Sequence, residues 1–157
     1  MQARINRRQL VGGAALLLAG SGLALPAFAK DAVHVVKDPS CGCCGAWIDH
    51  LAAGGFATSV EMREAAALDV YKREMGIPEA LASCHTATVG GYVIEGHVPA
   101  ADIRKLLSEA PDAIGLSVPG MPYGSPGMGP ETERKTYDVV LIHKDGSSEV
   151  FTRYPAA

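Results

Sequence analysis

Three of the four cysteines in this chain lie within four positions, in the segment KDPSCGCCG at residues 37–45. Cys41 and Cys44 have the C-x-x-C spacing of a redox-active dithiol, and Cys43 lies between them. Thiolate is the nucleophile in disulfide exchange and also a soft ligand that binds Cu(I) and Zn(II). The segment therefore indicates either a dithiol that transfers electrons or a group of thiolates that binds a metal ion.

The residues that follow predict a helix that begins at the cysteines. Its apolar side chains recur at the spacing of one helix face, at Cys44, Trp47, Ile48 and Leu51. Gly54 and Gly55 end the pattern. Because a helix N-terminus carries a partial positive charge and unpaired N–H groups, it stabilises a thiolate. We therefore expect Cys41, at or just before this terminus, to be the most acidic thiol.

The rest of the chain predicts elements in the order β-α-β-α-β-β-α, followed by a loop and a β-hairpin. The expected strands are 33–36, 56–62, 85–89 and 92–95, the further helices 66–75 and 99–110, the loop 117–130 and the hairpin strands 137–143 and 149–154. The first seven elements follow the order of thioredoxin, with C-x-x-C on the turn into the first helix. We therefore predict an α/β fold of the thioredoxin-like class (βαβαββα) with an added C-terminal β-hairpin.

Cys84 and His85 lie at the start of the third predicted strand. In thioredoxins the residue at that point is a cis-proline that lies against the C-x-x-C motif. With the same topology, a fourth sulfur and an imidazole would approach the cysteine segment from the opposite side. We therefore predict that Cys84 joins the other three sulfurs, and the alternative is an inert cysteine in the core.

The first 29 residues are typical of a secretory signal peptide. They combine Arg4, Arg7 and Arg8 with an apolar run and the small-x-small site Ala27-Phe28-Ala29. The segment at residues 6–10 also fits a twin-arginine signal. We therefore predict a signal peptide at 1–29, a single domain at 30–157 and export of the mature chain.

The net charge of the predicted mature chain limits the classes of partner that it is expected to bind. The 14 Lys and Arg less the three signal arginines leave 11, against 17 Asp and Glu, a net charge of −6. This excess of acidic residues disfavours nucleic acid and anionic membrane surfaces. It favours a cation as the partner, and after signal cleavage no membrane association is expected.

Four cysteines in an exported chain ordinarily form two disulfides, but this spacing resists that arrangement. A bridge between Cys43 and Cys44 is strained, and so is one between Cys41 and Cys43. The remaining choices are Cys41–Cys44 or a bridge from the segment to Cys84. Either choice leaves two thiols free, which favours a use for them such as metal binding.

Four segments resemble the DUF411 family, and the chain is identified as a member of it. They are DPSCGCCGAWIDHL, IPEALASCHTATVGGYVIEGHVPAADIRKLL, GLSVPGMPYGSPGM and YDVVLIHKDG, and they extend over almost all of the chain after residue 29. The resemblance implies a periplasmic thioredoxin-like protein that binds copper and contributes to copper tolerance. It implies Cys41, Cys43, Cys44 and Cys84 as ligands of Cu(I), with a multinuclear thiolate cluster as one form of the site. It also implies other periplasmic copper-handling proteins as partners.

Four further residues are weaker candidates for metal ligands, namely His85, His97, Met121 and Met128. The two methionines lie in the Pro/Gly-rich loop, which has no helix or strand period to bury them. Thioethers are soft ligands that suit Cu(I), and the alternative is that they fill gaps in the core. Met62 and Met75 are expected in the core.

Two alternatives to copper binding remain open. The first is a thiol–disulfide oxidoreductase that uses the Cys41/Cys44 pair, with Cys43 modulating it or with copper coupled to the exchange. The second is a zinc site, since four sulfurs suit tetrahedral Zn(II), although C-x-C-C is a poor match to zinc-knuckle spacing. The sequence favours a binding protein over an enzyme, because no carboxylate pair, Ser/His/Asp set or phosphate loop stands out.

Overall fold

The computed structural model describes residues 32–157, so the predicted signal peptide lies outside the described residues. Within that range, no helix has the length and apolar character needed to cross a membrane.

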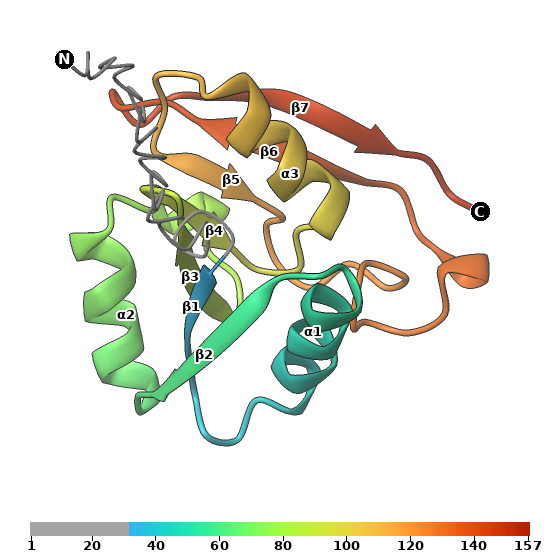
Figure 1. Ribbon diagram of the computed structural model, residues 1–157, viewed down its shortest axis with the longest axis horizontal. Helices are drawn as coiled ribbons and strands as arrows, with labels where there is room; N and C mark the ends of the chain where they lie inside the picture. The colour runs from blue at the N-terminus through green and yellow to red at the C-terminus, as the bar shows by residue number, and fades with distance from the viewer. Residues whose placement is uncertain (1–31) are drawn as a thin grey trace, which may run out of the picture.

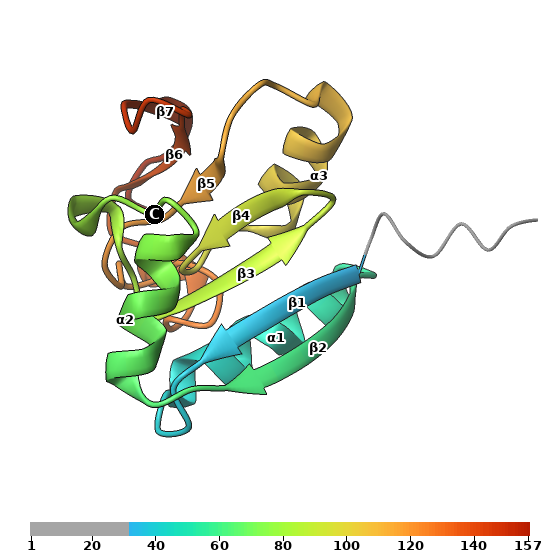
Figure 2. The ribbon, with the colours of Figure 1, turned by 90° about the vertical axis from the view of Figure 1, so that its left-hand side faces the viewer.

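The described chain forms one mixed β-sheet. Its strands are β1 (Ala32–Lys37), β2 (Ala57–Met62), β3 (His85–Val89), β4 (Tyr92–Glu95), β5 (Gly115–Ser117), β6 (Tyr137–Ile142) and β7 (Ser148–Tyr154). They lie in the spatial order β2-β1-β3-β4-β5-β6-β7 (Figures 1 and 2). β1 is parallel to β2 and β4 is parallel to β5, while the other neighbouring pairs are antiparallel.

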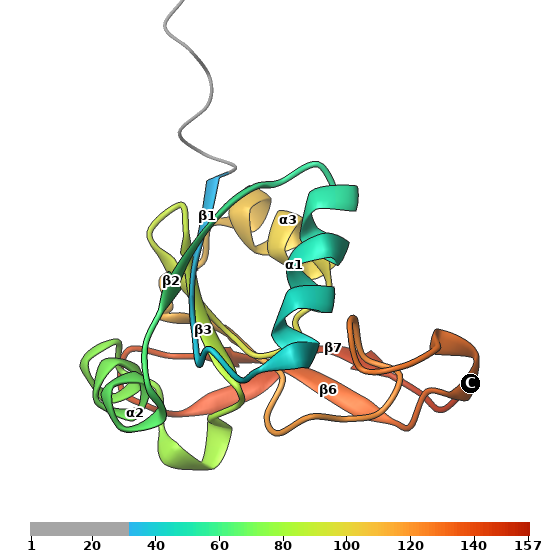
Figure 3. The ribbon, with the colours of Figure 1, turned by 90° about the horizontal axis from the view of Figure 1, so that it is seen from below.

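Three α-helices pack on this sheet in the described residues. They are α1 (Gly42–Ala53), α2 (Ala65–Glu74) and α3 (Ala100–Glu109), with short 3-10 turns η2 (Glu79–Leu81) and η3 (Glu131–Glu133). Figure 3 shows α1 and α3 side by side on one face, with α2 across the sheet from them. The predicted cysteine ligands lie at the N-terminus of α1 and just before the start of β3.

The main hydrophobic core lies between the sheet and the α1/α3 pair. Trp47 and Leu51 of α1 and Ile103 and Leu106 of α3 are fully buried. The strand residues that meet them alternate along each strand, as in Val33, Val35, Ala87, Val89, Ile94, Leu116, Val139 and Leu141. Burial of each large apolar side chain contributes about 1.5–3 kcal/mol, so this core fixes how α1 sits on the sheet.

The predicted order of elements is correct through α3, and the closing hairpin is present as β6 and β7. One strand was not predicted from the sequence. Residues 115–117, which lead into the predicted loop, form β5. β5 pairs with β4 on one side and β6 on the other, so the hairpin continues the main sheet. Three residues are too few to show the two-residue period of a strand, and Gly115 weakens the signal further.

A second, smaller core lies on the α2 face and contains Ile77, Val93 and Ile142. Met75 packs against it, as predicted. The prediction that Met62 is a core residue is wrong, because its side chain is 57% exposed. Met62 ends the edge strand β2, which has a neighbouring strand on one side only.

Candidate metal centre

The four cysteine sulfurs meet at one point between α1 and β3. Cys41 is the N-cap of α1, Cys43 and Cys44 lie in its first turn, and Cys84 immediately precedes β3. The Cys43 sulfur is 3.6 Å from the Cys41 sulfur and 4.0 Å from the Cys84 sulfur. The Cys44 and Cys84 sulfurs are 3.6 Å apart, and all four lie within 4.8 Å of one another.

Cys41 and Cys44 form a disulfide, which is one of the two bridges expected from the sequence. Cys43 and Cys84 are free thiols, each half-buried. The structure therefore holds the oxidised form of the C-x-x-C pair with two more sulfurs in contact with it. Two electrons and two protons would convert this group into four thiols in the same place.

Two imidazoles approach Cys84. His85 Nδ1 is 3.2 Å from the Cys84 sulfur, and His97 Nε2 is 3.1 Å from it. His97 Nδ1 donates a hydrogen bond to the Pro126 carbonyl at 2.7 Å, which leaves the lone pair of Nε2 directed at the sulfur. Burial lowers the pKa of His97, so the neutral imidazole that a soft metal ion needs is favoured.

His85 is fully buried against the ring of Trp47, with ring centroids 4.3 Å apart. Its Nε2 has no hydrogen-bond partner in the described residues. Burial, followed by the electrostatic influence of the neighbouring His97, holds the pKa of His85 well below its ordinary value. The second imidazole at the sulfurs is therefore also neutral.

The surroundings of Cys84 make its thiol a weak acid. Burial, followed by the neighbouring Cys43, raises the pKa of Cys84 to about 12. A metal ion that replaces this proton supplies the positive charge that the site lacks. The combination of thiols and neutral imidazoles suits a soft cation.

The Pro/Gly-rich loop between β5 and β6 packs directly on the first turn of α1. Gly127 has φ +84°, and a Cβ at this position would lie 2.7 Å from Trp47 N and 3.0 Å from the Cys43 carbonyl oxygen. Only glycine combines this backbone conformation with so close an approach. The contact places the preceding carbonyl, that of Pro126, at His97.

The two loop methionines are placed differently. Met121 is 56% exposed, whereas Met128 is half-buried and follows Gly127. The contacts that join the four sulfurs and the two imidazoles include neither thioether. The structure therefore brings together Cys41, Cys43, Cys44, Cys84, His85 and His97.

Sequence reasoning overlooked Lys37, which lies next to this group. Lys37 pairs with His85 across β1 and β3 and is only 6% exposed. Its Nζ donates to the Asp38 carbonyl at 2.9 Å and lies 3.7 Å from the Met62 sulfur. No local sequence signal marks this burial, because a charged strand residue before a turn is ordinarily exposed.

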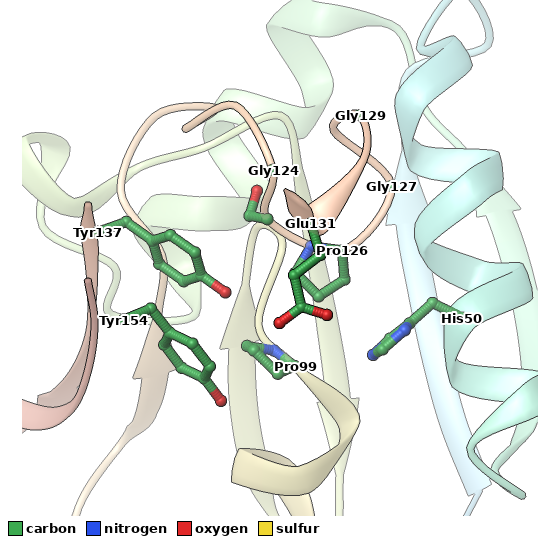
Figure 4. Close-up of a pocket in the computed structure, with 10 residues that line it drawn as sticks. His50, Pro99, Gly124, Pro126, Gly127, Gly129, Glu131, Tyr137 and Tyr154 are labelled. Atoms are coloured by element: carbon green, nitrogen blue, oxygen red, sulfur yellow. The ribbon is translucent and has the colours of Figure 1, made fainter. Parts of the chain in front are cut away.

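A cavity of about 340 Å³ lies beside the loop and shares Pro126 and Gly127 with the site. Figure 4 shows His50, Glu131, Tyr137 and Tyr154 among its lining residues. None of the four cysteines lines it. The His50 Nε2 accepts a hydrogen bond from Ala100 N at 3.1 Å, which joins α1 to the start of α3.

Comparisons with known proteins identify similar chains. The sequence profile of a family described as "Protein of unknown function, DUF411" matches residues 81–128. The solved structure "Copper resistance protein copG- Form 1" resembles this chain with a TM-score of 0.75 and 42% identity, over 81% of this chain and 99% of that one. Form 2 resembles it with a TM-score of 0.72 and 44% identity, over 79% and 98%. No curated protein sequence matches the chain.

Proposed function

The chain belongs to the DUF411 family of copper-resistance proteins, and on this basis we propose that it binds Cu(I) and contributes to copper tolerance. The ligands are the thiolates of Cys41, Cys43, Cys44 and Cys84. The observation that carries the proposal is the meeting of these four sulfurs within 4.8 Å, from two elements far apart in the sequence.

The donor set supports copper over zinc. Four sulfurs and two imidazole nitrogens, those of His85 and His97, make more soft donors than the four that one tetrahedral Zn(II) uses. Thiolate and imidazole suit both Cu(I) and Zn(II), so the number of donors, rather than their type, is what favours copper. The surplus of donors favours more than one copper ion, held in a multinuclear thiolate cluster. Met128, which is half-buried in the loop after β5, is a further candidate ligand.

The fold that we propose for this function is thioredoxin-like. The support is the order β2-β1-β3-β4 with β3 antiparallel to its neighbours, and a C-x-x-C motif at the N-terminus of α1. In that fold Cys84 stands where a proline would lie against the motif. A proline at this position borders a surface that binds peptides, whereas a cysteine there offers a sulfur that can bind a metal ion.

The proposed location is the periplasm, and the proposed partners are copper ions and other copper-handling proteins there. The support is the composition of residues 1–29 and the Cys41–Cys44 disulfide, which persists in oxidising compartments. The net acidic charge of the chain after residue 29 also favours a cation over nucleic acid.

A copper count tests the proposal. We expect the reduced, metal-free chain, loaded with Cu(I) under anaerobic conditions, to bind more than one copper per molecule. Replacement of all four cysteines by serine should abolish binding, because hydroxyls are poor ligands for Cu(I). His143→Ala, which removes a histidine beside the β6–β7 turn, serves as the control and should bind as the wild type does. Stoichiometric binding by the four-serine variant would show that the cysteines are not the ligands.

A second function is favoured by the disulfide. The free Cys84 thiol lies 3.6 Å from the Cys44 sulfur, within reach of exchange. In a copper-coupled reaction, two Cu(II) would take one electron each as two thiols form a disulfide and release two protons. One disulfide formed per two Cu(II) reduced supports this reaction, whereas insulin reduction by the metal-free protein supports plain thiol–disulfide exchange.

A further inference from the structure

The carboxylate of Glu95 binds three hydrogen-bond donors inside the protein. Glu95 is the last residue of β4 and is fully buried. Its Oε1 accepts hydrogen bonds from the Ser83 N–H and from Lys72 Nζ, both at 2.6 Å. Its Oε2 accepts the Thr86 hydroxyl at 2.6 Å, and Lys72 also donates to that hydroxyl at 3.0 Å.

These contacts lie on both sides of Cys84 and His85 in the sequence. Ser83 precedes Cys84, and Thr86 follows His85. Thr86 lies directly opposite Glu95 in the β3–β4 pair. Because side chains alternate along a strand, Thr86 faces α2 while His85 faces α1 and Trp47. One carboxylate therefore holds both ends of the segment 83–86 from the α2 face, across the sheet from the His85 ring.

The Ser83 N–H depends on this carboxylate. In the part of the chain that the structure describes, Glu95 is its one hydrogen-bond acceptor. The neighbouring bonds come from the loop after β5, where Gly120 N donates to the Ala82 carbonyl at 3.1 Å and Ser83 Oγ donates to the Gly120 carbonyl. Without Glu95, the backbone just before Cys84 would retain the loop contacts and lose its link to β4.

We propose that Glu95, paired with Lys72, is a positioning residue that holds Cys84 against Cys43 and Cys44. Neither side chain touches a sulfur, and both act through the Ser83 and Thr86 contacts. The inference deepens the proposed copper site and rests on it for its effect on metal binding. The effect of Glu95 on the position of the Cys84 sulfur does not require a metal ion.

Lys72 and Glu95 must be changed together in a test. Lys72 is 6% exposed, so removal of either partner alone leaves an uncompensated buried charge. Two double variants avoid this difficulty. Lys72→Met/Glu95→Gln keeps an amide oxygen that can accept the Ser83 N–H, whereas Lys72→Met/Glu95→Leu leaves that N–H without an acceptor. The pair of variants differs chiefly in the contact that the proposal invokes.

The first readout is independent of metal. In a Cys41→Ser/Cys43→Ser background, the equilibrium of the Cys44 and Cys84 thiols with glutathione gives their effective concentration. The loss of a buried acceptor should lower it by about tenfold in the Leu variant, and the Gln variant should stay within about twofold of the unaltered background. Equal values in the two double variants would overturn the proposal.

The second readout is Cu(I) affinity, measured in the four-cysteine protein by competition with a chelator and by thiolate-to-copper absorption. We expect a weakening of about tenfold in the Leu variant and recovery in the Gln variant. In a Cys84→Ser background the Leu change should have no further effect, because the contact acts through Cys84. A loss of the same size in that background would overturn the proposal.

Asp102→Leu provides the matched control for a general loss of stability. Asp102 is a buried carboxylate that accepts the Thr152 and Tyr154 hydroxyls at 2.6 and 2.7 Å, away from Cys84. It should lower the melting temperature and leave both readouts unchanged. If the wild type binds no copper but the glutathione equilibrium shifts as expected, the proposed function fails and the positioning role stands.

Discussion

At the scale of the residue, Cys84 is the centre of the site. It contacts Cys43, Cys44, His85 and His97, whereas each of the other cysteines meets fewer of these groups. Its thiol is buried and close to another thiol, and this environment favours the protonated form. The metal-free site therefore keeps its central ligand neutral until a cation displaces the proton.

The reactivity of Cys84 follows from that pKa of about 12. In the metal-free protein with Cys41–Cys44 oxidised, we expect iodoacetamide to label Cys84 about a hundredfold more slowly at pH 8 than in the urea-unfolded chain, after the lower nucleophilicity of acidic thiols is allowed for. The rate should keep rising with pH well above the ordinary thiol pKa of about 8.5. Peptide mapping by mass spectrometry measures it. A rate that levels off near pH 8.5 in the folded protein would contradict the prediction.

At the scale of the element, the site exists because a helix, a strand and a loop converge. α1 carries three cysteines into the group, the start of β3 carries Cys84 and His85, and the loop after β5 directs the Pro126 carbonyl at His97. The loop reaches this position through Gly127, which lies against the first turn of α1. The close approach of loop and helix therefore sets the orientation of the His97 ring.

Two glycine substitutions distinguish the contact of the loop with α1 from the effect of positive φ on stability. Gly127→Ala should destabilise the protein by about 2–4 kcal/mol, because the methyl group meets α1 and the residue has positive φ. Gly146→Ala is the matched control, since Gly146 has nearly the same φ, +83°, with nothing within 4 Å of a Cβ. It should cost only the conformational part, about 1–2 kcal/mol.

Chemical denaturation measures both free energies of unfolding, and a Cu(I) titration follows the site. We expect weaker copper binding in the Gly127 variant alone. Equal destabilisation by the two substitutions would show that the loop does not depend on its contact with α1.

At the scale of the whole molecule, the C-terminal hairpin is a structural part of the sheet. β6 lies between β5 and β7, and its Val139, Leu141 and Ile142 are buried in the two cores. Tyr154 of β7 donates to Asp102 of α3, which joins the end of the chain to the helix beside α1. The hairpin therefore contributes to the stability of the sheet as a whole.

Truncation tests this dependence. A chain of residues 30–130 should show no cooperative thermal transition, because the buried side chains of β6 contribute about 1.5–3 kcal/mol each against a typical total stability of about 5–15 kcal/mol. Deletion of residues 156–157, which are exposed, should leave the transition in place. Calorimetry and near-ultraviolet circular dichroism provide the measurement. A cooperative transition in the 30–130 chain would show that the first part folds alone.

The sequence by itself determined most of the elements and the chemistry of the ligands. Local signals were sufficient for this, because the 3.6-residue period of α1, the glycines at its end and the thiol spacing each involve residues close in the chain. Cys84 could be assigned to the site only through the expected topology. The structure supports that placement with a sulfur contact across 40 residues.

The tertiary structure alone decided what depends on contacts between distant residues. It showed that β5 joins the hairpin to the sheet, that Met62 is exposed, and that His97 rather than Met121 reaches the sulfurs. It also revealed the buried Lys72–Glu95 pair, because two charged residues 23 positions apart show no local pattern. The sequence thus indicated the candidate ligands, while their distances and protonation depend on burial and neighbours that only the folded chain brings together.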